Sequence, residues 1–338
     1  MKSLTLLLVC SCVTTLLTAQ NLLHKVAIDD DNGVFEYQDS KNNVVFSADT
    51  FMAMPAQKMK DVAAFVLMDG RSFYQFRNGK QQPGVYFWDN WYDCENDGFI
   101  RFRDTTKLVG QYNSRGEIAV PARYNELNKL TNGYCFGLKG STKACPDLEC
   151  EHYSWEGGEM VFLDSNGTEI ALFDNNLFFW DLDLYGLSIS NTPSKDSSCL
   201  RFSGADGKFY SIPYATQQFI AWYQKTGVKN LEKNALKQLN YYHGENNGTL
   251  SKKRWWKKYR SAVNAFYANT RNNPSVVVSN ELISDLSPGY APYTNNCGEL
   301  HPKHLVFEVL ATDLKKGLDI LRFVKVGNTY CLIELEDE

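Results

Sequence analysis

Pairs of tight-turn residues recur along the chain up to about residue 213, and they constrain its fold more than any other feature. Five short β-type segments each contain one pair: Asn42–Asn43, Asn78–Gly79, Arg115–Gly116, Asn166–Gly167 and Asp206–Gly207. Asn-Gly and Asp-Gly supply the positive φ angles of primed hairpin turns, and the flanking residues alternate between apolar and polar. The sequence therefore predicts a series of β-hairpins.

The spacing of these turns indicates a repeat. Successive second turn residues are 36, 37, 51 and 40 positions apart, so the third interval contains an insertion. A second marker agrees, because the segment 97–102 is echoed 35 residues later by 132–137. One hairpin cannot bury its apolar face alone, so such units must stack on their neighbours. We expect a mainly β region of stacked β-hairpin repeats over residues 20–212.

The pattern changes after residue 212. Three helices are expected over 214–227, 231–242 and 251–273, and four strands over 274–283, 304–311, 319–327 and 329–336. In the third helix, Trp255, Tyr259, Val263 and Phe266 fall on one face. Residues 213–338 are therefore predicted to form an α+β C-terminal domain.

Residues 1–19 have the pattern of a secretory signal peptide. Lys2 precedes an apolar run, and a small-residue cleavage pattern ends at Ala19. We expect export to the periplasm, the outer surface or the medium, with lipoprotein anchoring at Cys12 as the less favoured alternative. No later stretch approaches the ~18 apolar residues of a membrane helix. The net charge of −4 argues against a nucleic-acid partner.

One segment resembles a known repeat. In residues 97–137, Val109–Gly110 takes the place of a Trp-Gly pair, Arg115–Gly116–Glu117 forms the turn, and Val120–Pro121 with Tyr124 matches a Pro-Tyr segment. This resembles the WG repeat of exported WG repeat-containing proteins of Bacteroidetes type, with the best match over about 97–175. Val109 departs from the tryptophan of that repeat. The resemblance implies an interaction role, and it implies neither catalytic residues nor a cofactor.

Seven cysteines follow the predicted signal peptide, and this odd number leaves at least one unpaired within the chain. Cys145, Cys150 and His152 lie together in the over-long third interval. A structural zinc site usually has a closer cysteine pair and a second pair of ligands. We therefore favour a Cys145–Cys150 disulfide over free thiols, and both over a metal site.

Cys297, His301 and His304 form a second weak candidate for a metal site. Their spacing matches the zinc patterns poorly, and Pro302 would interrupt a helix that could align the histidines. A polar loop is the preferred interpretation.

Two aromatic and acidic clusters are the candidate ligand-binding segments. The first, within 86–97, contains Trp88, Asp89, Trp91, Tyr92 and Asp93, and the second, within 177–186, contains Trp180, Asp181 and Tyr185. Flat apolar faces beside carboxylates suit sugars or peptides. The preferred alternative is that alternate aromatic residues pack between hairpins while the Asp and Asn residues form the turns.

The segment 252–260 carries six positive charges in nine residues. An anionic partner, a lipid headgroup or a polysaccharide is one interpretation. A solvated helix face, with Lys and Arg stems covering apolar surface, is preferred.

Motifs for catalysis are missing from the sequence. It contains no Gly-x-Ser-x-Gly elbow, no His-Glu-x-x-His helix and no phosphate-binding glycine loop. We predict an exported, non-enzymatic protein–protein interaction or structural module of the cell envelope, without a cofactor and with an unknown protein or glycan partner. The alternative is a glycan-binding or glycan-hydrolysing envelope protein that uses the aromatic and acidic clusters.

Overall fold

The computed structural model describes residues 22–29, 34–48, 56, 58–67, 69–88, 91–146, 150, 153–174, 176–177, 179–243, 246–279, 290–311 and 319–337. The predicted signal peptide, Cys12, Asp89 and His152 lie outside them. The chain divides into two compact units, Met1–Thr168 and Glu169–Glu338. This division lies before the boundary predicted between residues 212 and 213, so the last hairpins fall in the second unit.

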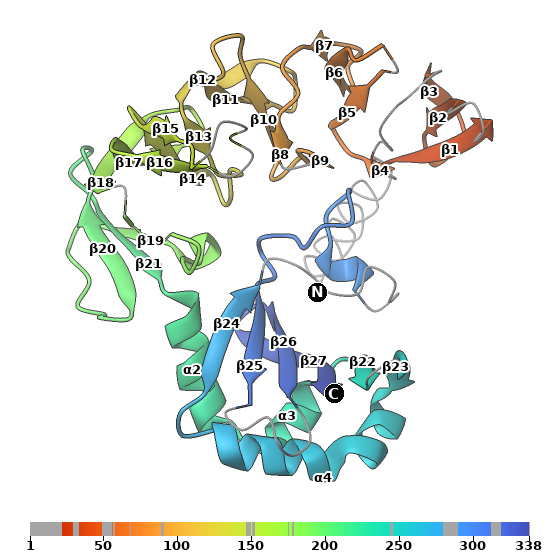
Figure 1. Ribbon diagram of the computed structural model, residues 1–338, viewed down its shortest axis with the longest axis vertical. Helices are drawn as coiled ribbons and strands as arrows, with labels where there is room; N and C mark the ends of the chain where they lie inside the picture. The colour runs from red at the N-terminus through yellow and green to blue at the C-terminus, as the bar shows by residue number, and fades with distance from the viewer. Residues whose placement is uncertain are drawn as a thin grey trace, which may run out of the picture. The chain divides into compact units, whose positions relative to one another are not determined.

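The first unit is built of small antiparallel sheets (Figure 1). One has the order β3-β2-β1-β4, from β1 (Leu23–Asp29), β2 (Val34–Gln38), β3 (Val44–Ala48) and β4 (Lys58–Met59). Two three-stranded sheets follow, formed by β5 (Val62–Val66), β6 (Ser72–Phe76) and β7 (Gln81–Gln82), and by β10 (Phe99–Arg103), β11 (Val109–Asn113) and β12 (Ile118–Tyr124). Next, β14 (Tyr134–Lys139) pairs with β13 (Glu126–Leu127) and β17 (Glu159–Asp164).

Two additional hairpins are inserted among these sheets. The first pairs β8 (Phe87–Trp88) with β9 (Trp91–Tyr92), and the second pairs β15 (Thr142–Ala144) with β16 (Ser154–Glu156). The β15–β16 hairpin lies between β14 and β17, where the preceding sheets have only a short connection. It is the insertion that lengthens the third turn interval.

The predicted turns occur, but their geometry differs from the primed two-residue turn. In the turn at Asn78–Gly79, the Gly79 amide donates to the Phe76 carbonyl, and Gly79 alone has a positive φ, of 86°. This is the arrangement of a type I turn followed by a G1 bulge. True two-residue turns occur instead at Asp97–Gly98 and Asn132–Gly133, where all four residues have positive φ.

Hydrogen bonds join positions that are one repeat apart. The Asp97 carboxylate accepts from the Asn132 amide at 2.7 Å, so the two echoed turns contact each other directly. Likewise, Asn78 Nδ2 donates to the Arg115 carbonyl at 3.1 Å, which links two successive turns. Neighbouring sheets therefore satisfy each other's polar groups as well as sharing an apolar core.

The cores of the first unit run from one sheet to the next. One cluster joins β5, β6, β10 and β11 and contains Val62, Tyr74, Phe76, Ile100, Phe102 and Tyr112. Gly110, at the second position of the repeat-like Val109–Gly110 pair, allows a close approach of backbones. A Cβ there would lie 2.5 Å from the Val120 carbonyl oxygen, so only glycine fits.

The second unit begins with further hairpin structure. After β18 (Glu169–Asp174) and the 3-10 helix η1 (Leu184–Gly186), a sheet of order β19-β21-β20 is formed by β19 (Ser188–Ser190), β20 (Cys199–Ser203) and β21 (Phe209–Pro213). Gly207 closes its turn with a φ of 78°. An ion pair between Asp183 and Lys325 joins this part to the rest of the unit.

The remainder of the second unit is α+β, as predicted. Its six-stranded sheet has the order β23-β22-β27-β26-β25-β24, and only β22 and β27 are parallel. The strands are β22 (Gln238–His243), β23 (Asn246–Ser251), β24 (Ser275–Ser279), β25 (Val306–Leu310), β26 (Ile320–Val326) and β27 (Thr329–Asp337). The helices are α2 (Ala215–Lys225), α3 (Val228–Asn234), α4 (Lys252–Thr270) and the 3-10 helix η2 (Ala291–Tyr293).

Helices α2 and α4 pack against this sheet through an aromatic core. The Phe219 ring on α2 stacks on that of Phe307 on β25, with centroids 4.6 Å apart, and Trp255 on α4 is fully buried. The helix expected over 231–242 was wrong in its second half, because residues from Gln238 form β22. Pairing with β23 and β27 outweighs the local helical pattern there.

Candidate functional site

The β8–β9 hairpin exposes three aromatic side chains. Phe87, Trp88 and Trp91 have exposed fractions of 44%, 58% and 47%, and we call them the aromatic surface. Trp88 and Trp91 are cross-strand partners, and the Trp91 ring stacks on the buried Tyr92 with centroids 5.2 Å apart. Burial between hairpins, predicted for alternate aromatic residues of this segment, therefore holds for Tyr86 and Tyr92 but not for Trp88 and Trp91.

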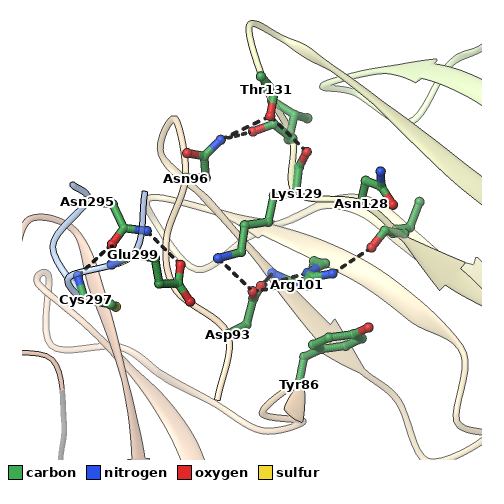
Figure 2. A network of polar contacts seen from close by, with 12 residues as sticks. Tyr86, Asp93, Asn96, Arg101, Asn128, Lys129, Thr131, Asn295, Cys297 and Glu299 are labelled. Carbon is green, nitrogen blue, oxygen red and sulfur yellow. Dashed lines mark hydrogen bonds and ion pairs between the residues drawn. The ribbon is translucent and has the colours of Figure 1, made fainter. Parts of the chain in front are cut away.

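An ion pair lies directly after this hairpin in sequence and is buried. Arg101 Nη2 is 2.6 Å from Asp93 Oδ1, and Arg101 Nε donates to Asp93 Oδ2 at 3.0 Å. Figure 2 shows this pair, together with Lys129, whose ammonium lies 3.7 Å from the same carboxylate. The remaining Arg101 nitrogen, Nη1, donates to the Leu127 carbonyl at 2.9 Å. The pair thus connects the end of β9 and β10 with β13, at the start of the next repeat within the first unit.

The charge state of this pair follows from its surroundings. Burial alone would raise the pKa of the Asp93 carboxyl, but the charges of Arg101 and Lys129 outweigh burial and lower that pKa. The guanidinium group of Arg101 lies 4.2 Å from the centroid of the Tyr86 ring, which adds a cation–π contact. Asp93 is ionised and fully engaged, so it is neither a general acid nor an open ligand-binding group. Its assignment as a candidate ligand-binding residue is corrected accordingly.

A second polar contact links the β8 segment to the next repeat of the first unit. The Tyr86 hydroxyl donates to Glu126 Oε2 at 2.7 Å, and Arg103 Nη2 lies 3.1 Å from Glu126 Oε1. The charges of Glu126 and Arg103 also act on Tyr153, which adjoins the inserted β15–β16 hairpin. Its pKa is raised by burial first and then by the charge of Glu126, while Arg103 opposes the shift. The charges of Glu126 and Arg103 therefore act on a residue at the edge of the inserted hairpin.

The inserted hairpin carries the predicted cysteine pair. Cys145 and Cys150 are joined by a disulfide, with their Cα atoms 4.9 Å apart. The Lys143 ammonium lies 3.8 Å from the centroid of the Tyr153 ring. Because both thiols are consumed in the bridge, the metal-binding alternative for Cys145 and Cys150 is excluded in this structure.

In the second predicted cluster, within residues 177–186, one residue has a structural role. Trp180 is exposed, with a fraction of 49%, and Tyr185 is half-buried. Asp181 Oδ1 accepts from the amide of Thr216 at 2.7 Å and from its hydroxyl at 2.6 Å. Asp181 therefore caps the N-terminus of α2, and it is corrected from a candidate ligand-binding residue to a helix cap.

The weak metal candidates of the second unit are also engaged otherwise. Cys297 is disulfide-bonded, His301 Nδ1 accepts from the Lys303 amide, and His304 Nδ1 contacts the Lys325 carbonyl at 3.0 Å. Among the described residues, no group of three or more His, Cys, Asp or Glu side chains could hold a metal ion.

The sequence did not single out Arg101, Lys129, Glu126 or Glu95. Glu95 is buried, and its Oε2 accepts from the amides of Asp61 and Val62 at 3.1 and 3.3 Å. The available signal covers two of them, because Glu95 contacts a residue 34 positions earlier and Lys129 lies 36 positions after Asp93, both close to one repeat. Charged residues about one repeat apart in sequence are good candidates for contacts between neighbouring repeats.

The fold and this surface define a mainly β protein of hairpin repeats with an α+β unit. No family model and no curated protein matches the chain. The crystal structure of BamB from Moraxella catarrhalis is similar over 55% of this chain and 56% of that chain, with 11% sequence identity and a TM-score of 0.22. The chain thus spans about half the length of that protein, and similarity at this level supports no functional inference. The resemblance to WG repeats stays a prediction.

Proposed function

We propose that this chain is an exported, non-enzymatic interaction module, and that the aromatic surface is its contact with a protein partner. One observation carries this proposal: Trp88 and Trp91 are cross-strand partners and both exposed on one short hairpin, and the adjacent Phe87 is exposed as well. Tryptophan is enriched among the residues that dominate binding energy at protein interfaces. Clustered exposed aromatic residues, unlike single ones, mark interaction sites.

The β8–β9 hairpin is anchored to the interior of the first unit, as a binding element would need to be. An isolated two-stranded hairpin is marginally stable in water, but this one continues directly into the buried Asp93–Arg101 pair. Because the surface is held before the partner arrives, less conformational entropy is lost on binding. A rigid support under exposed aromatic residues favours recognition over simple packing.

Glycan binding is the second candidate, and the exposed tryptophans favour it as well. Stacking on sugar rings needs flat, accessible aromatic faces, which Trp88 and Trp91 provide. Hydrolysis is less well supported, because it needs two free carboxylates. Asp93 is bound by Arg101, and Asp181 caps α2.

Site-specific crosslinking tests the proposal. A photoreactive amino acid at position 88 or 91 is expected to give the same protein adduct in the producing cell. The control is position 118, where Ile118 is even more exposed, at 60%, and no adduct is expected there. The proposal fails if positions 88 and 91 give no protein adduct, or if the purified chain binds a defined glycan and Trp88→Ala abolishes that binding.

Export is part of the proposal and rests on residues 1–19 of the sequence. Within the described part of the chain, no helix is long and apolar enough to cross a membrane. Fractionation of the producing cell and sequencing of the mature N-terminus would test export directly. Recovery from the cytoplasm with Met1 still present would contradict it.

A further inference from the structure

Helix α4 carries most of its cationic residues on the side opposite its buried apolar residues. Its buried side carries Trp255, Trp256, Val263, Phe266 and Tyr267. At about 100° per residue, the exposed residues Lys253, Arg254, Lys257 and Lys258 fall within an arc of about 140° on the opposite side. We call these four residues the basic face. The helix contains no acidic residue, although the whole chain has a net charge of −4.

The other two cations at this end of α4 have structural partners. Lys252 Nζ donates to the carbonyls of Lys233 and Ala235 at the end of α3. Arg260 Nη2 lies 2.6 Å from Glu232 Oε1. These contacts fix α4 against α3, and they distinguish Lys252 and Arg260 from the basic face.

Of the four cations of the basic face, Lys258 is partly compensated, since its pKa is raised by Tyr259 first and also by the charge of Asp337. Lys258 lies over the rings of Tyr241 and Tyr259, at 4.7 and 4.8 Å. Lys253, Arg254 and Lys257 form no hydrogen bond or ion pair with any other described residue. Like charges four residues apart on a helix destabilise it, and α4 contains two such pairs, Lys253 with Lys257 and Arg254 with Lys258. A partner that supplies negative charge would relieve this repulsion.

We propose that the basic face docks on an anionic phospholipid surface. Three of its four cations are lysines, which act as strongly hydrated point charges, whereas specific recognition of one anion favours the planar fork of arginine. The exposed side of a single helix is convex, so it can meet a surface of many mobile headgroups. The aromatic residues of α4 are buried, so contact stays at headgroup depth and depends on charge alone. This inference is independent of the aromatic surface on the first unit.

Vesicle co-sedimentation of the purified chain tests this docking. Binding is expected to vesicles containing phosphatidylglycerol and not to vesicles of phosphatidylcholine alone, and it should weaken as salt rises. Each cation removed should lower the partition coefficient roughly fivefold. The variant replaces all four residues: Lys253→Gln, Arg254→Gln, Lys257→Gln and Lys258→Gln. The matched control removes four exposed lysines elsewhere: Lys41→Gln, Lys195→Gln, Lys225→Gln and Lys303→Gln.

Loss of binding in the first variant and retention in the control support the proposal. Equal binding by the first variant and the parent chain, equal losses in both variants, or equal binding to neutral vesicles would overturn it. Tighter direct binding to soluble polyphosphate than to anionic vesicles, at matched phosphate concentration, would also overturn it and indicate a polyanion partner. If thermal unfolding shows that the fourfold variant is misfolded, the pair Lys253→Gln and Lys257→Gln replaces it in the same comparison.

Discussion

Arg101 and Asp93 form a two-point ion pair, through Nη2–Oδ1 at 2.6 Å and Nε–Oδ2 at 3.0 Å, with both residues buried. This pair starts where the β8–β9 hairpin ends, so it joins the exposed aromatic surface to the interior of the repeat region. Its partners on either side are the Tyr86 ring and the Leu127 carbonyl. The surface proposed to bind a partner therefore depends on a buried charge pair.

Removing one member of this pair should destabilise the first unit strongly. Asp93→Ala leaves the Arg101 guanidinium buried without its counter-charge, and the loss of unfolding free energy should be about 3–5 kcal/mol. Urea unfolding followed by circular dichroism would measure it. The control is Glu117→Ala, which breaks the exposed Arg115–Glu117 pair and should leave the midpoint unchanged. Equal effects of the two variants would contradict the structural role given to Asp93.

Tyr74→Phe tests the contacts between neighbouring sheets. The buried Tyr74 hydroxyl donates to the Arg101 carbonyl at 2.7 Å and accepts from the Tyr86 amide at 2.9 Å. Its removal leaves two buried backbone groups unpaired and should cost about 1–3 kcal/mol of unfolding free energy. Tyr112→Phe removes a longer, partly buried bond to the Pro83 carbonyl and should cost less. The reverse order of the two effects would contradict this assignment.

Glu95 should make the stability of the first unit depend on pH. Burial, followed by the charge of Asp61, raises its pKa to about 7, so the folded state favours the protonated carboxyl. The stabilising effect is complete below the pKa of the unfolded chain and is lost as pH rises through about 7. Glu95→Gln should therefore flatten the profile and raise stability at pH 8 by on the order of 2–3 kcal/mol. A thermal-unfolding series from pH 5 to 8 that is the same for both proteins would rule this out.

The Cys145–Cys150 bridge should have a local effect. It closes a loop of sequence separation 5, so the chain-entropy model gives it about 2 kcal/mol at most. Cys145→Ser with Cys150→Ser should keep the fold of the first unit but loosen the inserted hairpin. Limited proteolysis would then cut near residues 146–153 first. Global unfolding of the variant would show that the bridge supports more than its own loop.

The sequence predicted the hairpins because turn chemistry is local. Glycines at 79, 116, 167 and 207 all have positive φ, and the echoed segments at 97 and 132 form matching turns. Their direct hydrogen bond, from the Asn132 amide to Asp97, was not predictable, because the pattern gives spacing and not orientation. The α+β region of the second unit was also predicted, except that residues from Gln238 form a strand that pairs with β27.

The candidate site was predicted less well, because burial of a charge depends on distant partners. Asp93 resembled a surface carboxylate beside aromatic residues, and its partner Arg101 lies on the next strand. Asp181 also resembled a surface carboxylate. Its side chain instead accepts a hydrogen bond from the amide of Thr216, 35 residues later, and so caps the N-terminus of α2. Conversely, alternate aromatic residues of this segment were expected to pack between hairpins, and the short β8–β9 hairpin instead leaves both Trp88 and Trp91 exposed.

The most direct test of the account measures affinity for the protein captured by crosslinking at positions 88 and 91. Trp88→Ala with Trp91→Ala should weaken that affinity at least ~30-fold, about 2 kcal/mol, as expected for interface residues that dominate binding. Trp180→Ala, which alters an equally exposed tryptophan in the second unit, should leave it unchanged. Unchanged affinity of the double variant, or the same loss from Trp180→Ala, would contradict the claim that the aromatic surface is the binding site.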